Sequence, residues 1–100
     1  MDLSNAERER LTKLMEECAE TIQIVSKIML FGYDEVNALD PSGPSNRERL
    51  EQELGDIWYW KREMQQAKDI SGVNVNERVF RKHKKAMQYT KYQPGSKWNG

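Results

Sequence analysis

The sequence predicts an all-α protein, an antiparallel helical bundle completed by oligomerisation. Apolar residues recur at spacings of three and four, Ser-x-x-Glu capping boxes open two of the helical segments, and no segment is typical of a strand. A chain of 100 residues forms one domain at most and buries only a modest core, so self-association would stabilise it. We expect a helical domain over residues 1–92 and a flexible C-terminal tail over residues 93–100.

The first helix is predicted between Ser4 and Gly32. Ser4 followed by Glu7 forms a capping box, and Gly32 supplies the stop. Between them lies an apolar stripe at helical spacing, made of Leu11, Met15, Cys18, Ile22, Val25 and Met29. Residues 34–44, which include Asp-Pro-Ser-Gly-Pro, predict a loop.

The second helix is predicted to begin at Ser45, which forms a capping box with Glu48. Its apolar positions are Leu50, Leu54, Ile57, Trp58 and Met64. Residues 69–73 are expected to connect it to a third helix, capped by Asn74 with Glu77. The inward positions of that helix are predicted to be Val75, Val79, His83, Ala86 and Met87.

Composition excludes several classes of protein. Hydrophobic residues make up 37% of the chain and charged residues 32%, and no apolar run is long enough to span a bilayer. The N-terminus is charged and lacks the apolar stretch of a signal peptide. The lone Cys18 cannot form an internal disulfide, which indicates a reducing compartment, and we expect the cytoplasm.

The net charge of zero conceals an asymmetry. Residues 1–77 hold all 16 acids and 9 bases, whereas residues 78–100 hold 7 bases and no acid. The basic segment could simply be attracted to the acidic body, or it could form a basic rim beside an acidic metal site that binds a polyphosphate. A nucleic-acid tail is less favoured, because the acidic body would repel a long polyanion.

Two short acidic motifs, the acidic steps, contain the candidate catalytic and metal-binding residues. Glu16-Glu17-Cys18-Ala19-Glu20 and Glu53-Leu54-Gly55-Asp56 each place carboxylates three residues apart, on one face of a helix. On a helical wheel with Cys18 at 0°, Glu17 falls at about −100° and Glu20 at about −160°, beside apolar residues. With Leu54 at 0°, Glu53 and Asp56 take the same angles on the second helix. Carboxylates from two helices can form an oxygen-lined site for a hard cation such as Mg²⁺.

Gly55 stands inside the second acidic step. Within a helix, glycine costs roughly 1 kcal/mol relative to alanine. Neutral sequence change at a tolerant position would explain Gly55. Its place between Glu53 and Asp56 instead favours the close approach of another helix or of a ligand.

On these residues the chain resembles the MazG-like all-α nucleoside triphosphate pyrophosphohydrolases. Their signature of E-E-x-x-E followed by E-x-x-D matches Glu16-Glu17-x-x-Glu20 and Glu53-x-x-Asp56. The resemblance covers roughly residues 8–91, and the interval over residues 21–52 is longer than is usual for the family.

The resemblance implies Mg²⁺-dependent hydrolysis of nucleoside triphosphates to the monophosphate and pyrophosphate, by a homodimer or homotetramer. It implies that Glu17, Glu20, Glu53 and Asp56 bind the metal, for which Mn²⁺ can substitute. Glu16 would orient or activate a water molecule, or serve a structural role.

Four further residues are candidates for binding the substrate. Lys27 lies two turns along from Glu20 on the same face, where it could contact phosphate or simply be solvated. Lys82 and Lys85 are further candidates, although solvation of a basic face explains either one more simply. Trp60 shares the acidic flank and could stack on a nucleobase, whereas a place in the core or in a subunit interface is more usual for such a residue.

Three alternatives stay open. The first is a narrower enzyme, similar to a dUTPase or acting on a modified nucleotide. The second is a non-catalytic helical interaction module whose acids only aid solubility. The third is a small nucleic-acid binder that uses the basic third helix, and its affinity would fall steeply with salt.

Overall fold

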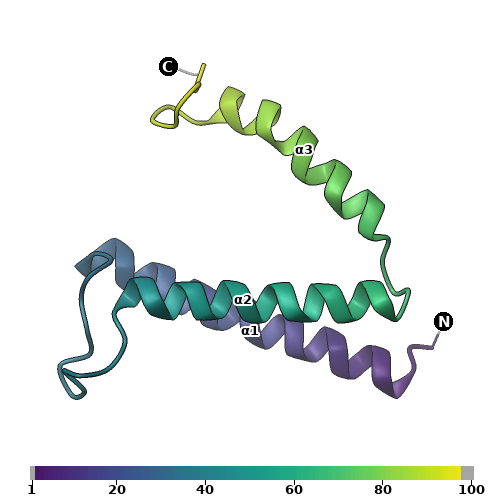
Figure 1. Ribbon diagram of the computed structural model, residues 1–100, viewed down its shortest axis with the longest axis horizontal. Coiled ribbons are helices and arrows are strands. Elements are labelled where there is room, and N and C mark those ends of the chain that lie inside the picture. The colour runs from purple at the N-terminus through teal and green to yellow at the C-terminus, as the bar shows by residue number, and fades with distance from the viewer. Residues whose placement is uncertain (1, 98–100) are drawn as a thin grey trace. The chain divides into compact units, whose positions relative to one another are not determined.

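The computed structural model describes residues 2–97, in which the chain forms three helices: α1 (Asn5–Phe31), α2 (Asn46–Gln66) and α3 (Gly72–Tyr89) (Figure 1). These residues contain no strand, only an isolated antiparallel bridge between Val36 and Ser45. The all-α prediction is therefore confirmed. The chain divides into two compact units, Met1–Asp69 and Ile70–Gly100, and each is described by itself.

The predicted ends of α1 are confirmed. The Glu7 N–H donates to Ser4 Oγ at 3.1 Å and the Ser4 N–H donates to Glu7 Oε1 at 2.8 Å, which completes the capping box. Gly32 ends the helix with φ of 88°, and its N–H donates to the Ile28 carbonyl at 2.8 Å. That backbone conformation favours glycine, because a Cβ atom would be strained there.

The second capping box is also present at the start of α2. The Glu48 N–H donates to Ser45 Oγ, and the Ser45 N–H donates to Glu48 Oε1, both at 3.2 Å. The helix ends in a Schellman motif, in which the Asp69 N–H bonds to the Met64 carbonyl and the Lys68 N–H to the Gln65 carbonyl. Lys68 adopts φ of 65° in this motif, a position that glycine usually occupies.

The prediction that Asn74 caps the third helix is wrong. Ser71 is the N-cap, and its Oγ accepts the Asn74 N–H at 3.2 Å. Serine and asparagine are about equally good N-caps, so the choice between two candidates three residues apart depends on the conformation of the preceding turn. Asn74 instead lies in the first turn of α3.

Helices α1 and α2 run antiparallel as a hairpin, and their contact is built on few buried residues (Figure 1). Ile24 and Met64 are its buried apolar side chains. Near the open end, the guanidinium of Arg10 binds the carboxylate of Asp69 through two hydrogen bonds of 2.6 and 3.0 Å. This bidentate pair ties the start of α1 to the end of α2.

The apolar stripe predicted for α1 is not the face that packs in this hairpin. Ile22 is 67% exposed and Met29 83%, whereas Ile24, on the acidic flank, is only 5% exposed. The acidic flank therefore faces α2. Within the unit Met1–Asp69, no other element covers the main apolar stripe.

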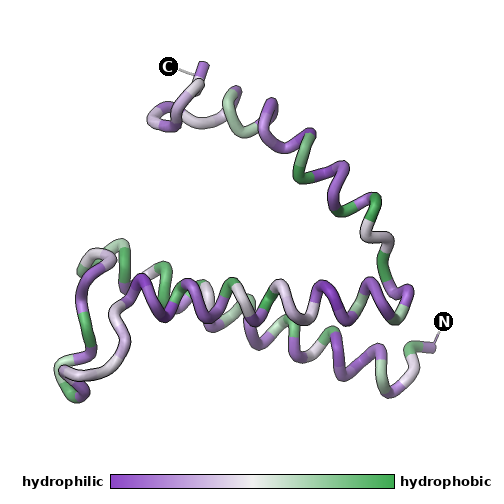
Figure 2. Tube along the Cα trace, viewed as in Figure 1, coloured by the Kyte–Doolittle hydropathy of each residue, from purple (hydrophilic) through white to green (hydrophobic). Residues whose placement is uncertain are grey.

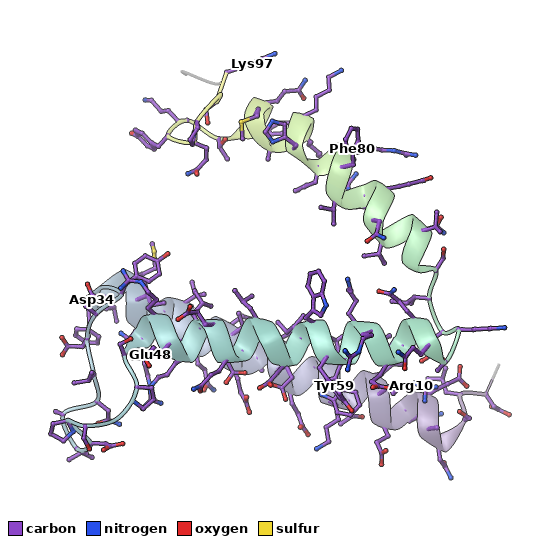
Figure 3. All side chains as sticks on the ribbon, in the orientation of Figure 1. Arg10, Asp34, Glu48, Tyr59, Phe80 and Lys97 are labelled. Carbon is purple, nitrogen blue, oxygen red and sulfur yellow. The ribbon has the colours of Figure 1, made fainter. Side chains whose placement is uncertain are left out.

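The loop between α1 and α2 is held against the start of α2. The Asn46 N–H donates to the Glu35 carbonyl and the Arg47 N–H to the Tyr33 carbonyl, both at 2.8 Å. The buried Asn46 side chain donates to the Gly32 carbonyl at 3.1 Å. Figure 3 labels Asp34 and Glu48 at this end of the hairpin, where Asp34 forms an ion pair with Arg47.

The unit that contains α3 is a basic amphipathic helix followed by a turn. Hydrophobic and hydrophilic residues alternate along it in Figure 2. Val75, Ala86 and Met87 are half-buried, while Val79 and His83, also predicted to face inward, are exposed. Of the predicted flexible tail, residues 98–100 lie outside the described residues. None of the helices within residues 2–97 is both long and apolar enough to cross a membrane.

The turn after α3 forms hydrogen bonds back to the helix. The Lys97 N–H donates to the Met87 carbonyl at 2.8 Å, and the hydroxyls of Thr90 and Ser96 lie 2.8 Å apart. The Gln93 N–H donates to Ser96 Oγ at 2.9 Å. Residues 93–97 therefore form a turn that is hydrogen-bonded to the end of α3, and the flexibility of the tail stays a prediction.

Candidate metal centre

Three of the predicted carboxylates converge between α1 and α2. Glu17 and Glu20, one turn apart on α1, and Glu53 on α2 each offer an oxygen atom, and these atoms lie within 4.8 Å of one another. The i, i+3 spacing puts the first pair on one face, and the antiparallel packing of the hairpin brings Glu53 opposite them. Three oxygen atoms at this spacing could hold one cation.

Two carboxylate oxygens in this group are buried without a hydrogen-bond partner. They are Glu17 Oε2 and Glu53 Oε2. Burying a charged oxygen without a donor is costly, and in proteins such oxygens are usually paired or coordinate a metal ion. A bound cation would satisfy both.

The pKa values of Glu53 and Glu17 are both raised, as expected for carboxyl groups that are crowded together. Burial, together with the hydrogen bonds and charges of the neighbouring carboxyl groups of Glu17 and Glu20, raises the pKa of Glu53 to about 7. Burial also raises the pKa of Glu17, to which the charges of Asp56 and Glu20 add. Without a cation, the ionised forms of these carboxylates repel one another.

Asp56 and Glu16 lie at the margin of the group. Asp56 is exposed and does not belong to the three converging carboxylates, but it lies close enough for its charge to act on Glu17. Glu16 is exposed and pairs with Lys13 at 3.4 Å. The structure thus brings three of the predicted ligands together, with Asp56 beside them and Glu16 outside.

Gly55 has open space around it. A Cβ atom built on it would meet nothing within 4 Å in the described chain. Close approach of another helix of the same hairpin therefore does not explain this glycine.

Basic side chains border the carboxylates. A cavity of about 150 Å³ beside the group is lined by Glu20 and Glu53 together with Lys27 and Arg49. Lys27 thus lines the same cavity as two of the carboxylates, and its contact with phosphate stays a prediction. Sequence reasoning missed Arg49, although it lies one helical turn before Glu53 and so shares its face.

The remaining substrate-binding candidates lie elsewhere. Lys82 and Lys85 line a cavity on α3 together with Tyr89. Trp60 is half-buried in α2 and packs edge-to-face on Tyr59, with the ring centroids 5.0 Å apart. Its nearest aromatic contact is thus within its own helix.

Clustered carboxylates with a cationic border suit a divalent cation bound to an anionic ligand. Comparison with known proteins adds no assignment to this chemistry: the chain matches no protein-family model, no curated protein and no solved structure.

Proposed function

We propose that the protein is a Mg²⁺-dependent nucleotide pyrophosphohydrolase of the MazG-like type, which converts nucleoside triphosphates to monophosphates and pyrophosphate. The observation that carries this proposal is the convergence of Glu17, Glu20 and Glu53 within 4.8 Å, with two of their oxygens buried and unpartnered. The choice of reaction comes from the resemblance of the two acidic steps to the signature of the MazG-like pyrophosphohydrolases.

In this proposal the three converging carboxylates hold the cation, and Asp56 completes the ligand set from the next turn of α2. Lys27 and Arg49, which border the same cavity, neutralise the phosphates of the substrate. Glu16, exposed beside Lys13, is assigned by the resemblance alone to a water molecule or to a structural role.

Bound Mg²⁺ would screen the charge of the triphosphate and make a bound water more acidic. The side chains would position the cation and the substrate. The hairpin presents carboxylates on two rigid helices, and the cationic pair holds the anionic end of the substrate beside them. Mn²⁺ would be accepted by the same oxygen ligands.

We also propose that the active form is a homodimer or homotetramer in which the helices complete a bundle. The apolar stripe of α1 is exposed on the unit Met1–Asp69, with Met15 and Ile22 each 67% accessible. Exposed apolar patches of this kind mark interaction surfaces. The free thiol of Cys18 on this stripe is compatible with a reducing cytoplasm, which we propose as its location.

The test is pyrophosphate release from a panel of standard and modified nucleoside triphosphates, with Mg²⁺ and with chelator. We expect Mg²⁺-dependent release that falls by about 100-fold or more in Glu53→Gln, because even outer-shell partners of a metal are worth 10–100-fold. Glu51→Gln is the matched control, since Glu51 is an exposed glutamate of the same helix outside the cluster.

Loss of activity in Glu53→Gln but not in Glu51→Gln would support the metal–carboxylate assignment. Turnover confined to dUTP or to one modified nucleotide would select the narrower enzyme. A folded chain that binds Mg²⁺ but releases pyrophosphate from no nucleotide would contradict the proposal and favour an interaction module.

A further inference from the structure

A second cavity lies beneath the loop that joins α1 to α2. Its volume is about 250 Å³, and its lining includes Phe31, Val36 and Asn37. It also includes Lys27 and Arg49, the two residues that border the cavity beside the carboxylates. The two cavities therefore meet at this pair of cations.

Hydrogen bonds hold the wall of the second cavity in place. The backbone of Glu35 accepts the Asn46 N–H at 2.8 Å, and Val36 bridges to Ser45. The buried Asn46 side chain holds the Gly32 carbonyl. Binding sites for small molecules are usually preformed in this way, and a cavity of this size suits one ring system rather than a large ligand.

The loop side of the lining, away from Lys27 and Arg49, suits a flat polar ring better than a phosphate group. Phe31 and Val36 supply apolar contact, and the carboxylate of Glu35 would repel an anion. Asn37 Oδ1 already accepts the Leu39 N–H at 2.9 Å, which leaves its amide NH₂ group to donate. The cavity thus offers a hydrogen-bond donor and a charged acceptor beside apolar surface, the pattern that recognises the edge and face of a nucleobase.

We propose that this cavity binds the base of a nucleoside triphosphate whose phosphates lie at the carboxylate cluster. Lys27 and Arg49 then lie between the two ends of the ligand, where its negative charge begins. The inference rests on the proposed function, because it takes the phosphate end from that site. It assigns base recognition to Glu35, Val36 and Asn37, on the loop whose length sets this chain apart from the family that it resembles.

The test is calorimetric binding of two Mg²⁺-loaded probes to the full chain. One is a nucleoside triphosphate with a methylene bridge between the α and β phosphorus atoms, and the other is inorganic tripolyphosphate, which has no base. We expect Val36→Trp, which fills the cavity, and Asn37→Ala, which removes the donor, to weaken nucleotide binding by about tenfold or more. Tripolyphosphate binding should change less than about twofold.

Leu39→Ala is the matched control, because Leu39 lies on the same loop and is 94% exposed. It should leave the affinity for both probes unchanged. If Val36→Trp does not fold by circular dichroism, Asn37→Ala and Glu35→Gln decide. Equal loss of both probes, no loss of either, or no binding of the nucleotide by the native chain would overturn the inference.

The two proposals fail separately. Cavity-dependent nucleotide binding without pyrophosphate release would leave the base site standing and contradict the enzymatic proposal. Pyrophosphate release at equal rate and KM in the native chain and the cavity variants would support the enzyme and overturn the base site.

Discussion

Glu53 is the side chain that stands to gain most from a bound cation, and its titration gives the first prediction. Its pKa is raised from 4.5 to about 7 in the folded, metal-free chain, chiefly by burial. Between those values the folded state binds more protons than the unfolded state at Glu53, so the contribution of Glu53 to stability is greatest below pH 4.5 and is lost as the pH rises through 7. In chelator, the chain should therefore melt at a lower temperature at pH 8 than at pH 5.

The shift of Glu17 acts in the same direction, whereas the lowered pKa of Asp69 beside Arg10 affects stability only in more acidic solution. Thermal melts with Glu53→Gln should show a weaker dependence on pH, and Glu51→Gln should keep the native one. Mg²⁺ at pH 8 should restore the melting temperature, because it binds the folded state. A melting temperature that rises from pH 5 to pH 8 in chelator would contradict this account.

How far single residues could be predicted depends on whether their role is local. The acidic steps are visible in the sequence because i, i+3 spacing alone puts Glu17 and Glu20 on one face. Arg49 was missed because an arginine on a helix has many uses, and only the packing of α2 on α1 puts it in the same cavity as Lys27 and Glu53.

The helices as elements also show that local features can be predicted from the sequence, whereas packing between helices cannot. Both Ser-x-x-Glu capping boxes are confirmed, since their two hydrogen bonds join residues only three apart. The packing face of α1 was harder to foresee. Its most apolar stripe is exposed and its acidic flank faces α2, because the face that packs depends on the partner helix and not on hydrophobicity alone.

The end of α2 provides a second prediction. Lys68 adopts φ of 65° in the Schellman motif, which costs a residue with a Cβ roughly 1–2 kcal/mol. Lys68→Gly should therefore raise the free energy of unfolding by about 0.5–1 kcal/mol after the entropic cost of glycine is subtracted. Urea unfolding of the metal-loaded chain measures this change.

Ala67→Gly is the control for that substitution. Ala67 adopts ordinary α-helical angles, with φ of −77° and ψ of −4°, so glycine there should lower the free energy of unfolding by roughly 0.5–1 kcal/mol. Equal destabilisation by both substitutions would show that Lys68 is not strained in solution.

For the molecule as a whole, the amount of buried apolar surface limits how stable a single copy of the chain can be. Among the described residues of the unit Met1–Asp69, Ile24 and Met64 are the buried apolar side chains, which is a small core. The sequence predicts the helical class correctly, because periodicity is a property of each segment. It cannot specify which surfaces of two copies meet, because that depends on shape and charge in three dimensions.

The apolar stripe of α1 supplies the last prediction. Ile22 lies near its centre and is 67% exposed on the unit Met1–Asp69, so Ile22→Asp should convert a dimer or tetramer to monomers and lower the melting temperature. Thr12→Asp, exposed and off the stripe, should leave the assembly intact. Light scattering after size-exclusion chromatography measures the mass of each.

Cys18 gives an independent readout of association. In the native chain its labelling by a maleimide should slow as the protein concentration rises, because association covers the stripe. In Ile22→Asp, labelling should be fast at every concentration, and a native chain that is monomeric and labels equally fast would contradict the oligomer.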